Sequence, residues 1–339
     1  MFNVTYKHKT LSRDPDQTLL DCLLDAGFEL PYGCRSGVCQ SCVMHVAQPL
    51  PDQGEGLCQQ GLSQAQIDAG CLLPCQSKPR FDISLADSPP QFQQRLEGTL
   101  SSKRWLSKDV LGIVIEVESG PVFRRGQFVT LWRDEATGRS YSLADCSPGG
   151  PELPGACKTW RLECHVRVIP GGAVSQWLAD QLEPGDQLTV RGPMGACTYQ
   201  AETDHRLMLL ASGTGLAPIA GIARDAVLAG HQGHISLLYA AREVAGFYYL
   251  DELASLVREL ANVECRLLVQ TPIESGNTSR FESGDVYQAS EALLREQSYD
   301  QLYVCGSENF CARIRRSAYL AGLPLAAIHA DAFLDSARG

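Results

Sequence analysis

The sequence predicts three successive domains: a small α+β domain, an antiparallel β-barrel, and an α/β domain with a doubly wound parallel sheet. Three observations lead to this prediction. Seven of the 14 cysteines fall before about residue 90, short β-like runs separated by turns fill about 95 to 200, and strands alternate with helices from about 205. A chain of 339 residues has room for two or three domains of ordinary size.

The first domain is predicted over residues 1–90. It opens with a strand-like run, FNVTY, and the stretch 16–27 then has helical apolar spacing and ends at Gly27, where a helix would stop. The run SPPQFQQ at 88–94 is typical of a linker.

The barrel is predicted over residues 95–202. Its expected strands are VLGIVIEV, GQFVTLW, SYSLA, RLECHVRVI and QLTVRG. The segment EPGD at 183–186 is a turn, because Pro presets φ and Gly accepts a positive φ. Several short strands at this spacing indicate a barrel.

The third domain is predicted over residues 203–339. Here RLMLLAS precedes a helix-like APIAGIARDAVLAG, ISLLYAA precedes YLDELASLVREL, and the strands ECRLLVQ and QLYVCG follow. Alternation of this kind is typical of a parallel, doubly wound sheet.

Composition and charge exclude several classes of function. A formal net charge of −10 argues against a general binder of nucleic acid or anionic membranes. No apolar run approaches the roughly 20 residues of a membrane-spanning helix, and the start MFNVTYKHKT has no apolar signal-peptide core, so we expect a cytoplasmic protein. In that compartment clustered cysteines indicate metal ligation rather than disulfides.

The cysteines of the first domain have a specific spacing. Cys34, Cys39 and Cys42 are followed by a candidate fourth ligand, Cys75, with Cys71 as its rival. The pattern C-x4-C-x2-C with a distant fourth Cys is the plant-type [2Fe–2S] spacing. Small residues between the cysteines let the backbone wrap closely and point its amides at the sulfurs.

Three other interpretations fit less well. A zinc site usually pairs two short hooks, and a disulfide knot conflicts with the expected compartment. A thioredoxin-like pair of Cys39 and Cys42 would leave Cys34 and Cys75 unexplained.

The runs LPYGCRSGVCQSC and LLPCQSKP resemble the [2Fe–2S] domain of plant-type ferredoxins, which implies a β-grasp fold. The context around Cys75 favours it over Cys71. The resemblance also implies a docking face for a partner near residues 35–38.

A second resemblance covers the rest of the chain. Alone, the run RSYS at 139–142 is consistent with a plain barrel strand, but it resembles the flavin motif of the ferredoxin–NAD(P)+ reductase family, and GGAVS follows at 171–175. This implies Tyr141 and Ser142 at the flavin ring and Arg139 and Ser175 at its phosphates. FAD is expected rather than FMN because relatives that begin with a ferredoxin domain use FAD. The implied flavin-binding residues are Arg139, Ser140, Tyr141, Ser142, Leu143, Gly171, Gly172, Val174 and Ser175.

The run GTGLAP resembles the nicotinamide-nucleotide motif of the same family, although Pro stands where the Rossmann pattern has its last Gly. Pro suits the first helical turn, and pyrophosphate binds at such helix N-termini. YVCG resembles a late motif whose Cys lies near the nicotinamide; the alternative for Cys305 is a buried strand-end thiol. The implied nucleotide-binding residues are Gly213, Thr214, Gly215, Leu216, Ala217, Pro218, Arg242, Cys305 and Gly306.

Three further expectations concern the site. The resemblance makes Tyr141, Ser142 and Cys305 the catalytic candidates. The segment HADAF carries Asp331 where the family often has Glu, and Phe333 either shields the flavin or belongs to the core. Arg242 could grip a 2′-phosphate with Arg280 and Ser279, but ferredoxin-fused relatives usually take NADH, so we expect NADH with NADPH as the alternative.

Together the motifs resemble the reductase components of bacterial Rieske-type dioxygenases and related monooxygenases. The resemblance implies an enzyme that passes electrons from NADH through FAD to a [2Fe–2S] cluster and on to an oxygenase. FAD is needed because the donor gives electron pairs and the cluster takes one electron at a time. Two alternatives are a reductase for a sugar-nucleotide dehydratase and a redox-sensing flavoprotein without fast turnover.

Overall fold

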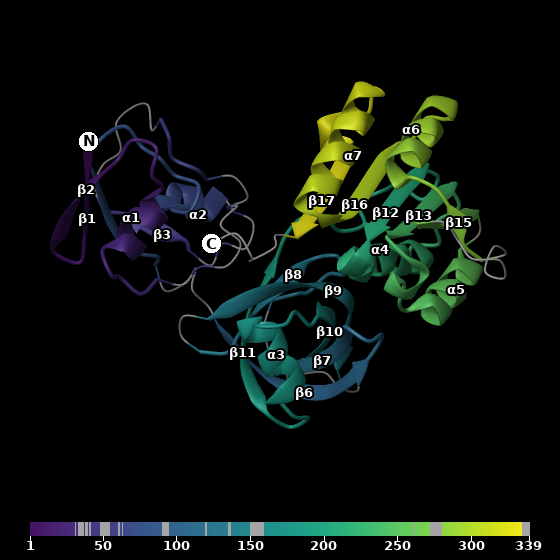
Figure 1. Ribbon diagram of the computed structural model, residues 1–339, viewed down its shortest axis with the longest axis horizontal. Coiled ribbons are helices and arrows are strands. Elements are labelled where there is room, and N and C mark those ends of the chain that lie inside the picture. Colours follow the sequence, from purple (N-terminus) through teal and green to yellow (C-terminus); the bar gives the residue numbers. More distant parts are fainter. Residues whose placement is uncertain are drawn as a thin grey trace.

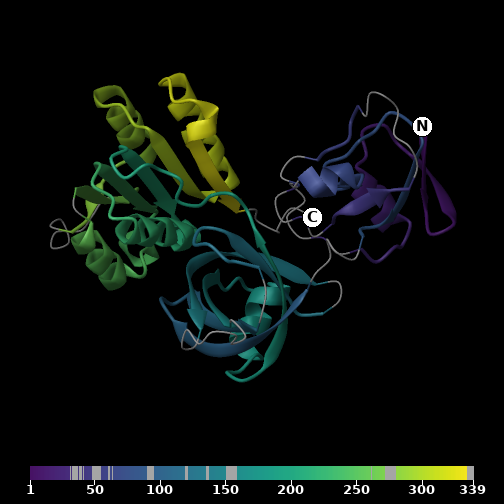
Figure 2. The same ribbon diagram turned by 180° about the vertical axis from the view of Figure 1, so that it is seen from behind.

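The fold comes from a computed structural model. It describes residues 1–30, 32, 37, 40, 42–47, 55–59, 62, 64–89, 95–118, 121–134, 137–149, 159–260, 262–271 and 280–333. Figure 1 and Figure 2 show an N-terminal unit that lies to one side of two others, which pack against each other. The three architectures predicted from the sequence are confirmed. Within these residues no helix has both the length and the apolarity to cross a bilayer.

The N-terminal unit is a mixed five-stranded sheet with helix α1 (Leu19–Asp25). The strands lie in the order β2-β1-β5-β3-β4. They are β1 (Phe2–Tyr6), β2 (Lys9–Arg13), β3 (Met44–Val46), β4 (Cys71–Leu72) and β5 (Ile83–Asp87), and a short helix α2 (Gln64–Asp68) precedes β4. Helix α1 starts later than the predicted 16–27 because the Thr18 side chain accepts from the Asp21 backbone N–H and caps it.

The second unit is a closed six-stranded antiparallel barrel in the order β10-β7-β6-β11-β8-β9. Its strands are β6 (Leu96–Trp105), β7 (Val110–Glu118), β8 (Phe128–Trp132), β9 (Gly138–Gly149), β10 (Thr159–Arg167) and β11 (Gln187–Met194), and helix α3 (Ala173–Asp180) follows β10. Strand β6 is not among the predicted strands, because its second half is mostly exposed and breaks the alternation on which the prediction relied.

The third unit is a parallel six-stranded sheet in the order β15-β14-β13-β12-β16-β17. Its strands are β12 (Leu207–Ser212), β13 (Ile235–Ala241), β14 (Val263–Val269), β15 (Glu282–Ser283), β16 (Gln301–Ser307) and β17 (Ile328–Phe333). Helices α4 (Leu216–Leu228) and α5 (Leu250–Glu259) pack on one face, and α6 (Val286–Glu296) and α7 (Glu308–Leu320) on the other. The strand order reverses between β12 and β16, and ligands bind at such switch points.

Helix α4 joins the parallel sheet to the barrel. A Cβ on Gly221 would lie 3.0 Å from the Leu143 carbonyl oxygen and 3.1 Å from that of Ala144, so a larger residue would crowd this approach of α4 to β9. Beside it the Arg125 guanidinium contacts Asp145 of the barrel at 2.5 Å and Asp225 of α4 at 2.8 Å. This contact explains why the two units lie together in both views.

The N-terminal unit meets the barrel at a backbone bridge. Tyr32, two residues before the first cysteine of the cluster motif, pairs in parallel with Thr137, which immediately precedes β9. Tyr32 therefore lies beside the start of the strand that carries the flavin motif.

Candidate active site

The GTG turn lies at the switch point of the parallel sheet. It forms a single 3-10 turn (Gly213–Gly215) between β12 and α4. Gly213 has a φ of +57°, and a Cβ on Gly215 would lie 2.0 Å from the Cys305 carbonyl oxygen, so both positions require glycine. No side chain caps the N-terminus of α4, and Pro218 lies in its first turn. A helix start without a side-chain cap, preceded by a glycine turn, suits an anionic group.

A barrel arginine reaches this turn. The Arg167 Nη2 atom lies 3.4 Å from where a Gly213 Cβ would be, and its other terminal nitrogen donates to Asp109. The Arg167 guanidinium, held by Asp109 beside a glycine turn, suits a pyrophosphate group. The residues present therefore fit a dinucleotide. Sequence reasoning missed Arg167. The alternation of polar and apolar residues in β10 could have indicated that Arg167 lies on the outer face of the barrel. Nothing in the sequence, however, shows which part of the protein covers that face.

The flavin motif lies on β9 where it faces β17. Successive residues of a strand point to opposite faces. Ser140 lies 3.0 Å from the Thr130 hydroxyl. The Ser142 hydroxyl donates a 2.5 Å hydrogen bond to Asp331 of β17. Tyr141 is half-buried against the barrel core, and burial raises the pKa of its hydroxyl, so it is protonated at neutral pH.

Cys305 and Asp331 lie side by side on neighbouring strands of the parallel sheet. They pair in register on β16 and β17, and both are buried. The Cys305 sulfur lies 3.9 Å from the sulfur of Cys197, a residue that follows the last barrel strand. Burial raises the pKa of the Cys305 thiol far above its usual value, and it raises the pKa of Asp331 to about 6 against the effect of the Ser142 hydrogen bond. The Cys305 thiol therefore stays neutral.

The Gly-Gly turn lies at the start of α3. Gly171 has a φ of +77°, and no side chain caps the helix. The Ser175 hydroxyl accepts from the Ile169 N–H at 3.2 Å, and a Cβ on Gly172 would lie 2.5 Å from that hydroxyl. Val174 anchors the helix in the barrel core. An uncapped helix start after a glycine turn suits a diphosphate, so these residues fit the phosphates of FAD.

The remaining candidates lie at the edges of this region. Arg242 follows β13 and is exposed, as is Glu243 beside it. Gly306 has a φ of +158° and packs against Ser212 at the end of β12. Phe333 is half-buried at the end of β17 and pairs in register with Ser307. Of the suggested 2′-phosphate pair, Ser279 lies outside the described residues, and Arg280 contacts Asp251 at 3.7 Å.

Two of the four expected iron ligands can be placed. Cys42 and Cys75 are both buried in the core of the N-terminal unit, whereas Cys34 and Cys39 lie outside the described residues. A Cβ on Gly37 would lie 3.2 Å from Leu73 and 3.4 Å from Gln76, so Gly37 packs against the segment that carries Cys75. The described residues of the motif therefore fit a cluster.

The rival cysteine has another partner. The Cys71 thiol is buried in β4 and interacts with the Ser88 hydroxyl, while burial raises its pKa. Within the described part of the chain no group of three metal-binding side chains comes together, as expected when two of four ligands fall outside it. Of the expected docking face, residues 35, 36 and 38 also lie outside the described residues.

Three family matches follow the same division of the chain. Residues 2–80 match the 2Fe-2S iron-sulfur cluster binding domain, residues 97–199 the oxidoreductase FAD-binding domain, and residues 209–316 the oxidoreductase NAD-binding domain. The chain is 30% identical to the ferredoxin–NAD(+) reductase component of the Xanthobacter autotrophicus alkene monooxygenase system, over 88% of this chain and 89% of that protein. It is thus a member of the iron–sulfur flavoprotein reductase family of oxygenase systems.

Other known proteins are similar to this chain over nearly its whole length. The phenol hydroxylase P5 protein of Acinetobacter pittii is 26% identical over 97% of this chain and 93% of its own length. An Amycolatopsis cytochrome P450 reductase shares the fold, with a TM-score of 0.64 at 24% identity over 99% of both chains. The ferredoxin reductase of a carbazole 1,9a-dioxygenase gives a TM-score of 0.63 at 22% identity over 98% of both chains. The reductase thus has a [2Fe–2S] domain, an FAD-binding domain and an NAD-binding domain.

Proposed function

We propose that this reductase draws electrons from NADH and delivers them to a terminal oxygenase protein in the cytoplasm. When bound, FAD accepts electrons in pairs and the [2Fe–2S] cluster carries them singly. The observation that carries the proposal is the meeting of Ser142 with Asp331 and Cys305. It joins the flavin motif of the barrel to the switch point that receives the dinucleotide. The names of the relatives, which are oxygenase or hydroxylase components, support an oxygenase as acceptor.

Each site residue has a proposed role. The GTG turn, Leu216 to Pro218 and Arg167 bind the dinucleotide pyrophosphate, while Cys305 and Gly306 shape the floor for the nicotinamide. The Cys305 thiol is neutral and buried, so it places no charge beside the cofactor.

On the barrel side, Tyr141 and Ser142 contact the flavin ring and Arg139 holds its phosphates with the α3 turn. Asp331 orients the Ser142 hydroxyl, and Phe333 covers the ring. No described side chain is needed as a general acid or base, because the protein positions cofactors and tunes their potentials.

The cluster is proposed to be bound by Cys34, Cys39, Cys42 and Cys75. The burial of Cys42 and Cys75, together with the contact of Gly37 with the segment around Cys75, supports this ligand set. The bridge from Tyr32 to Thr137 joins the residue two before Cys34 to the residue before β9, which supports transfer from the flavin side of the barrel to the cluster. The domain boundaries 1–90, 95–202 and 203–339 remain our proposal, and the observed sheets lie within them.

NADH is proposed over NADPH. Arg242 could pair with a 2′-phosphate, but the exposed carboxylate of Glu243 beside it would repel one. The test is stopped-flow reduction of the purified protein by each nucleotide, with the flavin and cluster absorbance followed separately. NADH should reduce both centres faster than NADPH at equal concentration. Negligible reduction of a protein that carries FAD and iron would contradict the proposal.

A further inference from the structure

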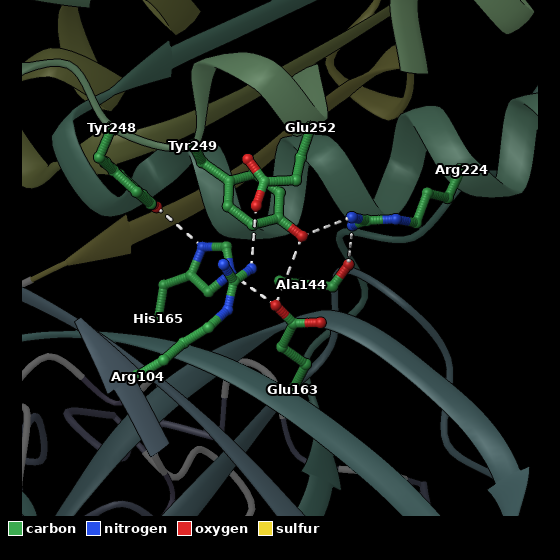
Figure 3. Close-up of polar contacts among 8 residues, drawn as sticks. All are labelled: Arg104, Ala144, Glu163, His165, Arg224, Tyr248, Tyr249 and Glu252. Atoms are coloured by element: carbon green, nitrogen blue, oxygen red, sulfur yellow. Dashed lines mark hydrogen bonds and ion pairs between the residues drawn. The ribbon is translucent and has the colours of Figure 1, made fainter. Parts of the chain in front are cut away.

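The outer face of β10 carries a row of polar residues, which the nucleotide-binding domain covers in part. Glu163, His165 and Arg167 alternate with Leu162, Cys164 and Val166, which belong to the barrel core. On the outer face His165 is only 4% exposed. Its Nδ1 atom lies 3.0 Å from the Tyr248 hydroxyl, and its Nε2 atom lies 3.1 Å from the Glu163 carboxylate. Figure 3 shows these side chains facing one another across the domain interface.

The hydrogen atoms in this chain of hydrogen bonds, from Tyr248 through His165 to Glu163, can be arranged in only one way. Burial lowers the pKa of His165 despite the attraction of Glu163, so the imidazole is neutral. Burial acts to raise the pKa of Glu163, but the His165 hydrogen bond and nearby arginines outweigh it and keep the carboxylate ionised. A carboxylate only accepts, so His165 donates to it from Nε2–H and accepts the Tyr248 hydroxyl hydrogen at Nδ1. The opposite tautomer would set a lone pair against the carboxylate.

A second branch fixes the next residue, Tyr249. Its hydroxyl donates to Glu163 at 3.4 Å and accepts from the Arg224 guanidinium at 2.8 Å, and Arg224 also donates to the Ala144 carbonyl oxygen of the barrel at 2.8 Å. Tyr249 has a left-handed backbone with a φ of +58°, which is uncommon for a residue that is not glycine. Surrounding contacts must hold such a conformation in place.

The two tyrosines end the segment 242–249, which leads from the carboxyl end of β13 to α5. Arg242 begins this segment, and the carboxyl ends of β12, β13 and β16 form the edge where the dinucleotide binds. Arg167, two residues after His165 on the same face, lies over the GTG turn. One face of β10 thus contacts both parts of the nucleotide-binding edge.

We propose that the Glu163–His165–Tyr248 chain is a positioning device that keeps segment 242–249 in the conformation that binds NADH. The inference rests on the proposed function and deepens it. None of the three side chains takes part in electron transfer; they act through the segment that they hold. A preformed site binds more tightly than one that must be ordered on binding, because less conformational entropy is lost.

The test compares two tyrosine variants. Tyr248→Phe removes the hydroxyl from the chain and leaves the ring in place. Tyr299→Phe is the matched control: Tyr299 is also buried in the same domain, and its hydroxyl bonds Ser236 at 2.8 Å and Gln297 at 2.6 Å, at the opposite edge of the sheet. Each variant is assayed for KM and kcat with NADH, for the Kd of NAD+ by calorimetry, for thermal unfolding, and for FAD and iron content.

We expect Tyr248→Phe to raise both the KM for NADH and the Kd for NAD+ about tenfold, with kcat at saturating NADH within twofold of wild type. Tyr299→Phe should lower the unfolding temperature similarly and leave both constants unchanged. If the two variants lose stability alike and neither changes affinity, the chain is only structural and the proposal is wrong. A fall in kcat with unchanged KM and Kd would also overturn it.

A second variant keeps the test decisive. If Tyr248→Phe does not fold, Glu163→Gln removes the charge that fixes the tautomer and should give the same loss of affinity; unchanged affinity would refute the proposal. Failure of the proposed function would look different, because the wild-type protein itself would neither bind NAD+ nor be reduced by NADH.

Discussion

The Ser142 hydroxyl donates a 2.5 Å hydrogen bond to the Asp331 carboxylate, and this bond joins the barrel to the edge strand of the parallel sheet. Asp331 is 7% exposed, and its pKa is raised to about 6. The bond therefore lies where the two cofactor motifs meet, and its acceptor changes charge near neutral pH.

We predict that Asp331 makes stability depend on pH. Its folded pKa is above its unfolded value of 3.8, so the folded state binds the proton more tightly. Stability contributed by this group is present at pH 4 and is lost as pH rises through 6, by about 3 kcal/mol in total. Asp331→Asn should therefore stabilise the protein relative to wild type increasingly between pH 4 and 6, with no further gain above pH 7. Denaturant unfolding across this range measures it, and an advantage independent of pH would argue against the shifted pKa.

The fourth iron ligand can be tested by comparing two cysteines. Cys75→Ser should lose the cluster, because a thiolate ligand is removed, while flavin reduction by NADH survives. Cys71→Ser should keep the cluster, because that thiol interacts with Ser88. Iron content and the spectrum of the reduced cluster report the result. The reverse pattern would make Cys71 the ligand.

Arg167 should contribute to dinucleotide affinity. Arg167→Ala removes the guanidinium over the GTG turn, and we expect the KM for NADH to rise about tenfold, the loss of one charge-assisted contact. Arg161→Ala is the control, because Arg161 lies on the same face of β10 and is exposed. Equal effects of the two substitutions in steady-state assays would exclude a specific contact.

The packing of α4 on the barrel should tolerate no added methyl group. Gly221→Ala places a Cβ 2.9 Å from Arg125 and close to two carbonyl oxygens, so we expect a loss of about 1–3 kcal/mol in the free energy of unfolding. Gly284→Ala should cost little, since its Cβ would lie 3.8 Å from the nearest atom. Thermal or denaturant unfolding distinguishes them, and a neutral Gly221→Ala would mean that the interface adjusts.

The sequence predicted the three architectures and the motif turns because periodicity and glycine placement are local properties. The prediction of the GTG turn assumed that another part of the backbone approaches its glycines closely, and the structure shows such an approach at Gly215. The sequence could not show what covers a face. The alternation in β10 marks His165 as outward, which would usually mean exposed, whereas the nucleotide-binding domain buries it. The Ser142–Asp331 bond is equally non-local, since 189 residues separate its partners.

The inner face of strand β10 lies in the barrel core, and His165 on its outer face is buried against the neighbouring domain. Chimaeras of such reductases should keep this interface between the barrel and the nucleotide-binding domain. A cut near residue 202 would expose Glu163 and His165 to water and leave Tyr248 unpaired, so residues 95–333 are best exchanged as one piece. A cut within 88–94 would leave that interface intact. The N-terminal [2Fe–2S] domain is therefore the part of the reductase that can be exchanged most easily.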